Sequence, residues 1–336
     1  MVNPTHIYPP STEPGPFNLN RYARVGLHEK ADGTFVNASP GSPVPTSDFL
    51  YLSAVSAGAV TGTRSVFKFG FNADVNGTEE TIWDYGGIYE HPAAAIQMSV
   101  SSSSVDDTAA GTGARTVSVA GLDADYNEIS EIVTLNGQTS VLTSASFLRV
   151  NRAFVVSAGS GGTAAGDIYV GTGVVSAGVP ATVYAYIQLG DNQSLMAVWT
   201  VPAGYTGYLL KGNIGTGTAN INQYITARLV QRPFGSVFRT AAKVTLQRGE
   251  INFDFVFPVP FAEKTDIEAR AFSSGANNLV FADFFIIWGQ FKTSRIICRW
   301  CTAAVMAKSK EKVTNVFYKM VQISVSLFDL FSLQCL

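Results

Sequence analysis

The sequence is poor in charged residues, since Asp, Glu, Lys and Arg make up only 14% of its 336 positions, against about 25% in an average soluble domain. Helical proteins display Glu and Lys on their outer faces, so this shortage disfavours a helical fold. A surface with few charges and many apolar residues also favours burial between subunits. A monomer coated with Ser, Thr and Asn is the alternative interpretation.

Cysteine is absent from the first 297 residues, and Cys298, Cys301 and Cys335 all follow. No disulfide framework can hold the main body, which fits assembly in a host cytoplasm. The stretch MVNPTHIYPPSTEPGPF lacks a basic n-region and an apolar h-region, so we expect no Sec export. No uninterrupted apolar run has transmembrane length, so we expect no membrane partner.

Positive charge is scarce in the main body. Residues 1–290 hold 16 Lys and Arg against 23 Asp and Glu, a net charge of −7, whereas residues 291–336 hold 7 against 2, a net charge of +5. Neutralising phosphates requires clustered Lys and Arg. We therefore expect no nucleic-acid partner.

Catalytic motifs are missing too. His6, His28 and His91 have no metal-ligand spacing, and no GxSxG motif is present. The members of a Ser-His-Asp triad meet only in space, and we expect none at His91. Cys298 and Cys301 have the spacing of half a zinc or redox site, but no second ligand pair follows. The Gly-rich stretches contain no GxxxxGK and are interpreted as turns. We predict that the protein is not an enzyme and uses no cofactor.

One acidic loop has the residue types of a calcium site. Asp123, Asp125 and Asn127, followed by Glu128, place oxygen atoms at alternate positions in GLDADYNEIS. The sixth-position Gly and the distal bidentate Glu of an EF-hand are missing. Asp and Asn also favour β-turns, because their side chains bond to the nearby backbone. The turn is the preferred interpretation, and a calcium site is the alternative.

The chain does contain many short strand patterns separated by turn signals. Eight of the fourteen prolines fall within residues 1–50, so residues 1–55 are predicted to be an extended arm, draped over a neighbouring subunit or disordered. Phe67, Phe69 and Phe71 alternate with smaller or polar residues and predict a strand with one aromatic face. Asn76-Gly77 and Asn136-Gly137 predict hairpin turns.

The fold class follows from these patterns. Residues 56–190 are expected to form one β domain, and residues 191–290, with seven predicted strands, a β-sandwich domain. No segment before residue 290 has an apolar stripe of helical period. We predict an all-β protein with two consecutive β-sandwich or jelly-roll-like domains.

The segment 291–336 differs from the rest, because it is basic, contains the cysteines and has no glycine. It is interpreted either as a C-terminal docking helix or as a stretch without a selected fold, produced by a changed reading frame. The abrupt shift in composition favours the second interpretation.

Whole phrases of the sequence, such as TAAGTGART, GLDADYNEISE and FLRVNRA, resemble a segment of virion structural proteins of tailed marine and freshwater bacteriophages. The later stretch VPAGYTGYLLKGNIGTG is similar to the domain that follows in those proteins. The resemblance covers about residues 79–290 and contains no catalytic motif. It implies a virion component, either a capsid decoration or head fibre or a tail component. It also implies a homo-oligomer, with a trimer favoured, that docks onto major capsid or tail proteins.

Two other functions stay open. A receptor- or glycan-binding tail protein would use aromatic residues near loops, and Tyr205, Tyr208 and Tyr224 are the candidates for stacking on a host surface glycan. A polysaccharide-degrading enzyme of the virion is the third hypothesis, without residues to carry it.

Overall fold

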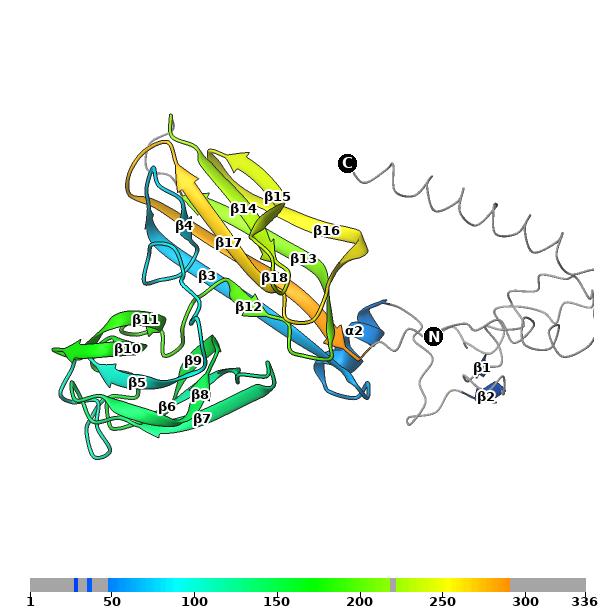
Figure 1. The fold of residues 1–336 in the computed structure, drawn as a ribbon. Helices are drawn as coiled ribbons and strands as arrows, with labels where there is room; N and C mark the ends of the chain where they lie inside the picture. Colours follow the sequence, from blue (N-terminus) through cyan, green and yellow to red (C-terminus); the bar gives the residue numbers. More distant parts are fainter. Residues whose placement is uncertain (1–26, 30–34, 38–47, 218–221, 291–336) are drawn as a thin grey trace, which may run out of the picture. The chain divides into compact units, whose positions relative to one another are not determined.

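The computed structural model describes residues 27–29, 35–37, 48–217 and 222–290, and its architecture is all-β (Figure 1). The prediction of an all-β, sandwich-like fold is confirmed. The elements are β1 (Leu27–Glu29), β2 (Phe35–Asn37), α2 (Asp48–Ser56), β3 (Thr63–Val75), β4 (Glu80–Thr81), β5 (Ile96–Ser102), β6 (Ala114–Leu122), β7 (Glu128–Thr134), β8 (Val141–Phe147), β9 (Arg149–Ala158), β10 (Ile168–Ser176), β11 (Val179–Ile187), β12 (Val198–Thr200), β13 (Thr206–Gly217), β14 (Ile225–Arg232), β15 (Arg239–Leu246), β16 (Arg248–Phe261), β17 (Asp266–Ser273) and β18 (Asn278–Gly289).

Strands β5 to β11 form the first sandwich. One sheet has the order β11-β10-β5-β8 and the other the order β7-β6-β9. Their facing sides enclose an apolar core with Met98, Val117, Phe147 and Ile168 fully buried. Strand β6 shows why the segment is a strand, because its β-branched Val117 and Val119 alternate along one buried face.

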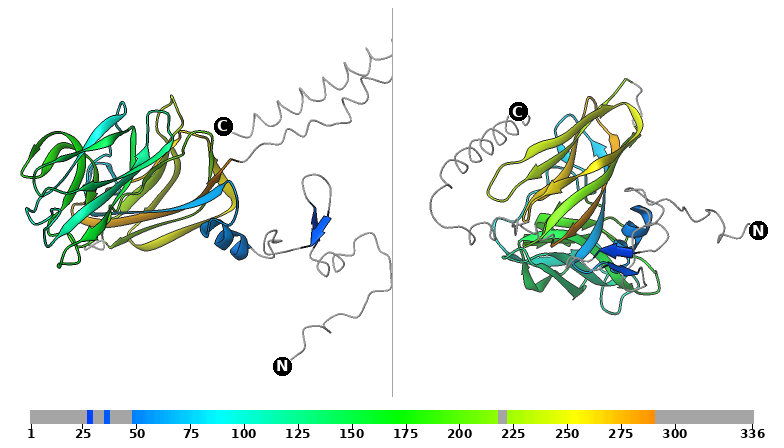
Figure 2. Two further views of the ribbon diagram at one scale, coloured as in Figure 1. Left: turned by 90° about the horizontal axis from the view of Figure 1, so that it is seen from below. Right: turned by 90° about the vertical axis from the view of Figure 1, so that its right-hand side faces the viewer.

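The second sandwich pairs a sheet of order β16-β13-β18-β3 with a sheet of order β12-β17-β14-β15, and β4 lies beside β17. Figure 2 shows these two layers from two further directions. The core between them contains Trp199, Phe261, Ile267, Phe284 and Trp288. All the strand pairs within both sandwiches are antiparallel.

The two sandwiches do not follow one another along the chain as the predicted domains 56–190 and 191–290 would. Strand β3 pairs with β18 from Thr63↔Gly289 to Asn278↔Val75, and β4 pairs with β17. The N-terminal part of the expected first domain therefore belongs to the second sandwich. The first sandwich is an insertion between β4 and β12. Such pairing joins strands about 200 residues apart, and local turn signals carry no information about it.

Neither Asn-Gly turn makes the predicted hairpin. Asn76-Gly77 follows β3, but β3 and β4 belong to different sheets; Asn136-Gly137 links β7, which pairs with β6, to β8, which pairs with β5. Gly137 does adopt the positive φ of 61° that such turns require. Each turn reverses the chain, but the next strand crosses to the opposite sheet.

The predicted arm and tail lie mostly outside the described residues. In the arm, the structure describes the short pair β1 and β2 and the helix α2. Helix α2 departs from the expected extended chain because the last proline of the arm is Pro45, and Asp48 then offers a favourable helix start. The tail prediction for residues 291–336 lies outside the described residues.

Candidate interaction surface and buried ion-pair cluster

The outer face of the β16-β13-β18-β3 sheet is aromatic along β3 and β18. Phe67 and Phe71 in β3 lie opposite Phe285 and Phe281 in β18. The ring centroids of Phe67 and Phe285 are 4.5 Å apart, and Phe69 stacks on Phe281 at 6.0 Å. Phe67 is 55% exposed and Phe285 is 42% exposed. We call this surface the aromatic face.

A glycine determines which way the phenylalanines point. A Cβ atom on Gly70 would lie 2.1 Å from the carbonyl oxygen of Ile82 and 2.7 Å from the Cβ of Ala197. Gly70 therefore faces inward, where β3 approaches the opposite layer closely. Because side chains alternate along a strand, Phe67, Phe69 and Phe71 must then face outward.

Two polar groups lie in the middle of the aromatic face. Asp283 in β18 and Asn213 in β13 are directly opposite each other. The Oδ1 atom of each is buried and has no hydrogen-bond partner in the described part of the chain. Burial raises the pKa of Asp283. Buried polar atoms in folded proteins nearly always have such partners.

A bulge on β16 adds further exposed apolar side chains. Leu209 pairs with Val259 and Lys211 with Asp254, so residues 255–258 stand opposite Leu210 alone. Val256 and Phe257 project from this bulge and are 89% and 86% exposed. A bulge bends its strand and interrupts regular pairing.

A buried ion-pair cluster joins the two sandwiches at Asp266, the first residue of β17. Arg149, at the start of β9, donates from Nε to Oδ1 at 2.7 Å and from Nη2 to Oδ2 at 3.1 Å. Arg232, at the end of β14, donates to Oδ2 from Nε at 2.9 Å and from Nη2 at 2.7 Å. The Thr200 hydroxyl donates to Oδ1 at 2.6 Å. The Asp266 side chain is only 3% exposed.

The electrostatic balance of Asp266 favours its charged form. Burial alone would raise the pKa of this carboxyl, but the neighbouring His91 and the Arg149 guanidinium lower the pKa to about 2. Arg149 also donates to the carbonyl oxygens of Leu148 and Pro92 and to the hydroxyl of Tyr126. These contacts fix the guanidinium from several sides.

A second carboxylate, Glu268, extends the cluster. Its Oε1 lies 2.8 Å from His91 Nε2, and its Oε2 accepts from Arg270 Nε at 2.8 Å and from the Thr81 hydroxyl at 3.2 Å. Burial would raise the pKa of Glu268, but the hydrogen bonds from His91 and Arg270 lower it. The side chain of Glu268 is fully buried.

The geometry at His91 is that of a structural contact. A catalytic triad needs a nucleophile hydrogen-bonded to the nitrogen that does not contact the carboxylate. Here Nε2 meets Glu268, and Nδ1 is 3.9 Å from Asp266 Oδ1 without a hydrogen-bond partner in the described structure. We interpret the cluster as a clamp between the sandwiches.

The acidic loop 122–128 has the bonds of a turn. The Asp123 Oδ1 atom accepts from the backbone amides of Asp125 and Asn127 at 2.9 Å, and Oδ2 accepts from Asn127 Nδ2 at 3.2 Å. Burial alone would raise the pKa of Asp123, but the bonds from Asn127 and Asp125 together hold it below its usual value. Tyr126 takes a φ of 67°, which completes the tight loop. In the described ranges, no group of three or more His, Cys, Asp or Glu residues is placed to hold a metal ion.

The structure does not bring the three candidate glycan-stacking tyrosines together. Tyr205 precedes β13 and packs on Trp288 with ring centroids 4.8 Å apart, and Tyr208 follows within β13. Tyr224 bonds through its backbone with Ser274, at the opposite end of the sandwich. The length of β13, about 40 Å at roughly 3.3 Å per residue, separates the two locations.

Two buried titratable groups were not predicted from the sequence. Lys68 is 6% exposed, donates to the carbonyl oxygen of Asn151, and has its pKa lowered to about 7 by burial and by the charge of Arg152. Both carboxylate oxygens of Asp84 are buried without partners among the described residues, and burial and Asp191 raise its pKa to about 7. The alternation that exposes Phe67 also places Lys68 on the inward side of the strand. The sequence pattern therefore contained the information that Lys68 would be buried.

Comparison with known proteins gave neither a matching family model nor a matching curated protein. Among solved structures, the chain is matched to the infectious bursal disease virus Gt strain at 10% identity, covering 69% of this chain and 76% of that chain, with a TM-score of 0.17. A VP2 subviral particle of infectious bursal disease virus matches at 11% identity, with coverages of 69% and 77% and the same TM-score. At this TM-score the matches do not establish a shared fold. No helix in the described ranges is long and apolar enough to span a membrane.

Proposed function

We propose that the protein is a structural component of a virion that assembles with copies of itself. The observation that carries this proposal is the aromatic face. Contiguous exposed apolar surface of this kind usually marks an interaction site. Aromatic residues are also enriched at the centres of protein interfaces.

The aromatic face has the size of the centre of a subunit interface. With 12 residues in β18 and the rings on β3 and β18, two of the four strands, the face measures about 40 Å by 10 Å, or roughly 400 Å². A standard interface buries about 800 Å² on each partner, so the face would supply about half of it.

The particle type is a finer part of the proposal. The resemblance of residues 79–290 to tailed-phage virion proteins supports a capsid decoration or head fibre, or a tail component. It also supports a homotrimer that docks onto capsid or tail proteins. The buried ion-pair cluster suits this role, because it holds the inserted sandwich against the sandwich that carries the aromatic face.

A receptor- or glycan-binding role is the second candidate, and one observation favours a location for it. A cleft of about 780 Å³ lies where loops of the two sandwiches meet. Its wall includes Tyr126, Phe234 and Lys264, and the Lys264 ammonium lies 5.2 Å from the Phe234 ring centroid. Phe234 is 65% exposed and offers a ring for a sugar to stack on. A glycan-array signal that Phe234→Ala abolishes and Phe257→Ala leaves intact would support this role.

The virion assignment is tested by labelling intact particles with gold-conjugated antibody raised against residues 56–290. We expect gold on the particles and peptides of this chain in their mass spectra. Gold over the head indicates a decoration or fibre, and gold at the tail indicates a tail component. Purified particles that carry neither gold nor peptides would contradict the proposal.

A further inference from the structure

One edge of the second sandwich is open. Strands β15 and β16 are the edge strands of the two sheets on this side, and in the described structure β15 pairs only with β14 and β16 only with β13. Their inward side chains Val244, Ile251, Phe253 and Phe255 pack on the core but are only partly buried. On the opposite side, all three residues of β12 are buried.

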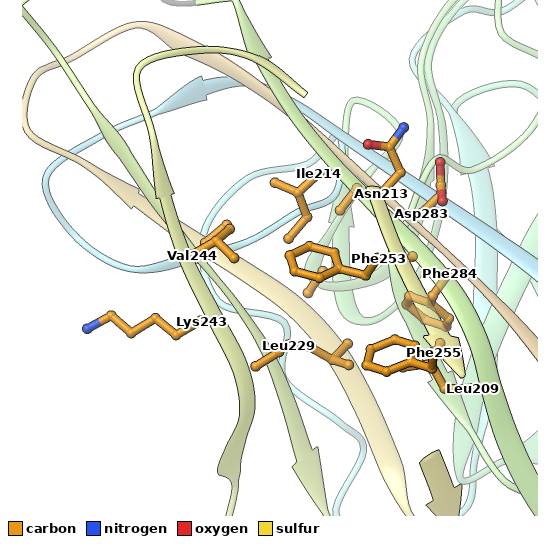
Figure 3. A pocket seen from close by; sticks show the side chains of 15 residues that line it. Leu209, Asn213, Ile214, Leu229, Lys243, Val244, Phe253, Phe255, Asp283 and Phe284 are labelled. Atoms are coloured by element: carbon orange, nitrogen blue, oxygen red, sulfur yellow. The ribbon is translucent and has the colours of Figure 1, made fainter. Parts of the chain in front are cut away.

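An apolar groove runs between these two edge strands (Figure 3). It is shallow, with about 30 Å³ of space that a water molecule can reach, and it is partly open to solvent. Leu229 and Val244 lie on one side, and Phe253 and Phe255 on the other, with Leu209 and Phe284 deeper in the core. The Lys243 side chain points away from the groove in Figure 3. The groove and the partly buried side chains beside it therefore offer an apolar surface that side chains from outside can cover.

The backbone of β15 suits an added strand better than that of β16. Strand β16 contains Pro258 and Pro260, which lack an amide donor, and is interrupted by the bulge at residues 255–258. Strand β15 has eight residues without proline. Exposed edges of this kind accept extended segments, whose main chain supplies hydrogen bonds and whose alternate side chains enter pockets.

The N-terminal arm contains a segment with the required pattern. In FNLNRYARV, residues 17–25, the apolar residues Phe17, Leu19, Ala23 and Val25 share one side of an extended chain. Asn18, Asn20, Tyr22 and Arg24 share the other side. Arg21 is the one charged residue on the apolar side, and its long stem allows the guanidinium to reach the rim of the groove. The nine residues match the eight of β15 in length.

We propose that residues 17–25 of a neighbouring copy add to β15 as a strand and lay Phe17, Leu19, Ala23 and Val25 over the apolar groove at the open edge. This inference rests on the proposed self-assembly and names one of its contacts. Arm exchange closes the open edge, covers the apolar groove and adds a second contact between copies that associate through the aromatic face. Ordering the arm costs conformational entropy, which burial of the four apolar side chains offsets.

The test uses the full chain with Cys298→Ser, Cys301→Ser and Cys335→Ser, so that only introduced cysteines can pair. One tagged copy carries Leu19→Cys and a differently tagged copy carries Val244→Cys, and the two are co-expressed and mildly oxidised. We expect a disulfide-linked dimer. The matched control replaces Leu19→Cys by Asn20→Cys, whose side chain lies on the opposite side of the strand, and at least tenfold less dimer is expected.

Three results would overturn the arm proposal. The first is an equal yield of dimer from the Leu19→Cys and Asn20→Cys variants. The second is linkage only within one chain when both cysteines are placed in the same copy. The third is preferential linkage of Val244→Cys to Val325→Cys in the tail. Particle labelling and the oligomeric mass of the unmodified chain are measured separately. Failure of the arm proposal therefore leaves the proposed function standing, and failure of the proposed function is recognised independently.

Discussion

Replacing Asp266 by Asn is expected to destabilise the protein strongly. The substitution keeps the shape of the side chain but leaves Arg149, buried and held by five hydrogen bonds, without its counter-charge. Removing one partner of a buried ion pair costs about 3–5 kcal/mol. The pKa gives an independent magnitude, since lowering it from 3.8 to about 2 corresponds to about 2.5 kcal/mol. We therefore expect Asp266→Asn to lower the free energy of unfolding by about 3 kcal/mol at pH 7.

The assay is urea denaturation, with Asp254→Asn as the matched control. Asp254 pairs with Lys211 at 3.0 Å, but the two side chains are 71% and 59% exposed. Exposed pairs contribute about 0–1 kcal/mol, so this variant should unfold nearly like the parent protein. Equal losses of stability in the two variants would refute the role assigned to the cluster.

The pH dependence gives a second check on the same residue. The folded-state pKa of Asp266 lies below that of the unfolded chain. Its contribution to stability is therefore complete above about pH 4 and is lost as the pH falls through about 2. The difference in unfolding free energy between the parent protein and Asp266→Asn should shrink over this interval, and a constant difference would contradict the explanation.

Three further predictions concern other groups. Lys68→Met should raise the free energy of unfolding at pH 6, because burial lowers the pKa of Lys68 to about 7. A pKa shift of this size corresponds to at most about 5 kcal/mol. Urea titrations at several pH values should show this gain shrinking toward pH 10. Asp84→Asn should stabilise the folded protein more at pH 8 than at pH 5. The reason is that the folded-state pKa of Asp84 is raised to about 7, so its charged form disfavours folding above that pH. Melting temperatures measured at both pH values check this. Asp123→Ala should cost about 1 kcal/mol through its lost hydrogen bonds, and millimolar calcium should not change the melting temperature of the parent protein.

The sequence predicted the β class because strand patterns extend along the whole described body. Low charge, β-branched residues and period-two alternation are local properties, and they indicated the strands without any partner being known. Strand partners are not local. The alternation of Phe67, Phe69 and Phe71 predicted a strand with one aromatic face, but it could not show that β18 would be its neighbour.

The two candidate sites differ in how much the sequence revealed. The aromatic face was visible as a pattern, although its exposure depends on Gly70 lying against Ile82 and Ala197. The ion-pair cluster was not visible, because Arg149 and Asp266 are 117 positions apart and meet only through folding. His91 has no metal-ligand spacing in the sequence, and its contact with Glu268 spans 177 positions.

The most direct test of self-assembly through the aromatic face is the mass of the full-length protein in solution, measured by sedimentation equilibrium. The parent protein is expected to be an oligomer, most simply a trimer. The double variant Phe67→Ser and Phe285→Ser should shift to the monomer mass, while Val174→Ser, at an 81% exposed position on β10, should not. A monomeric parent protein, or a double variant that keeps the parent's mass, would contradict the account.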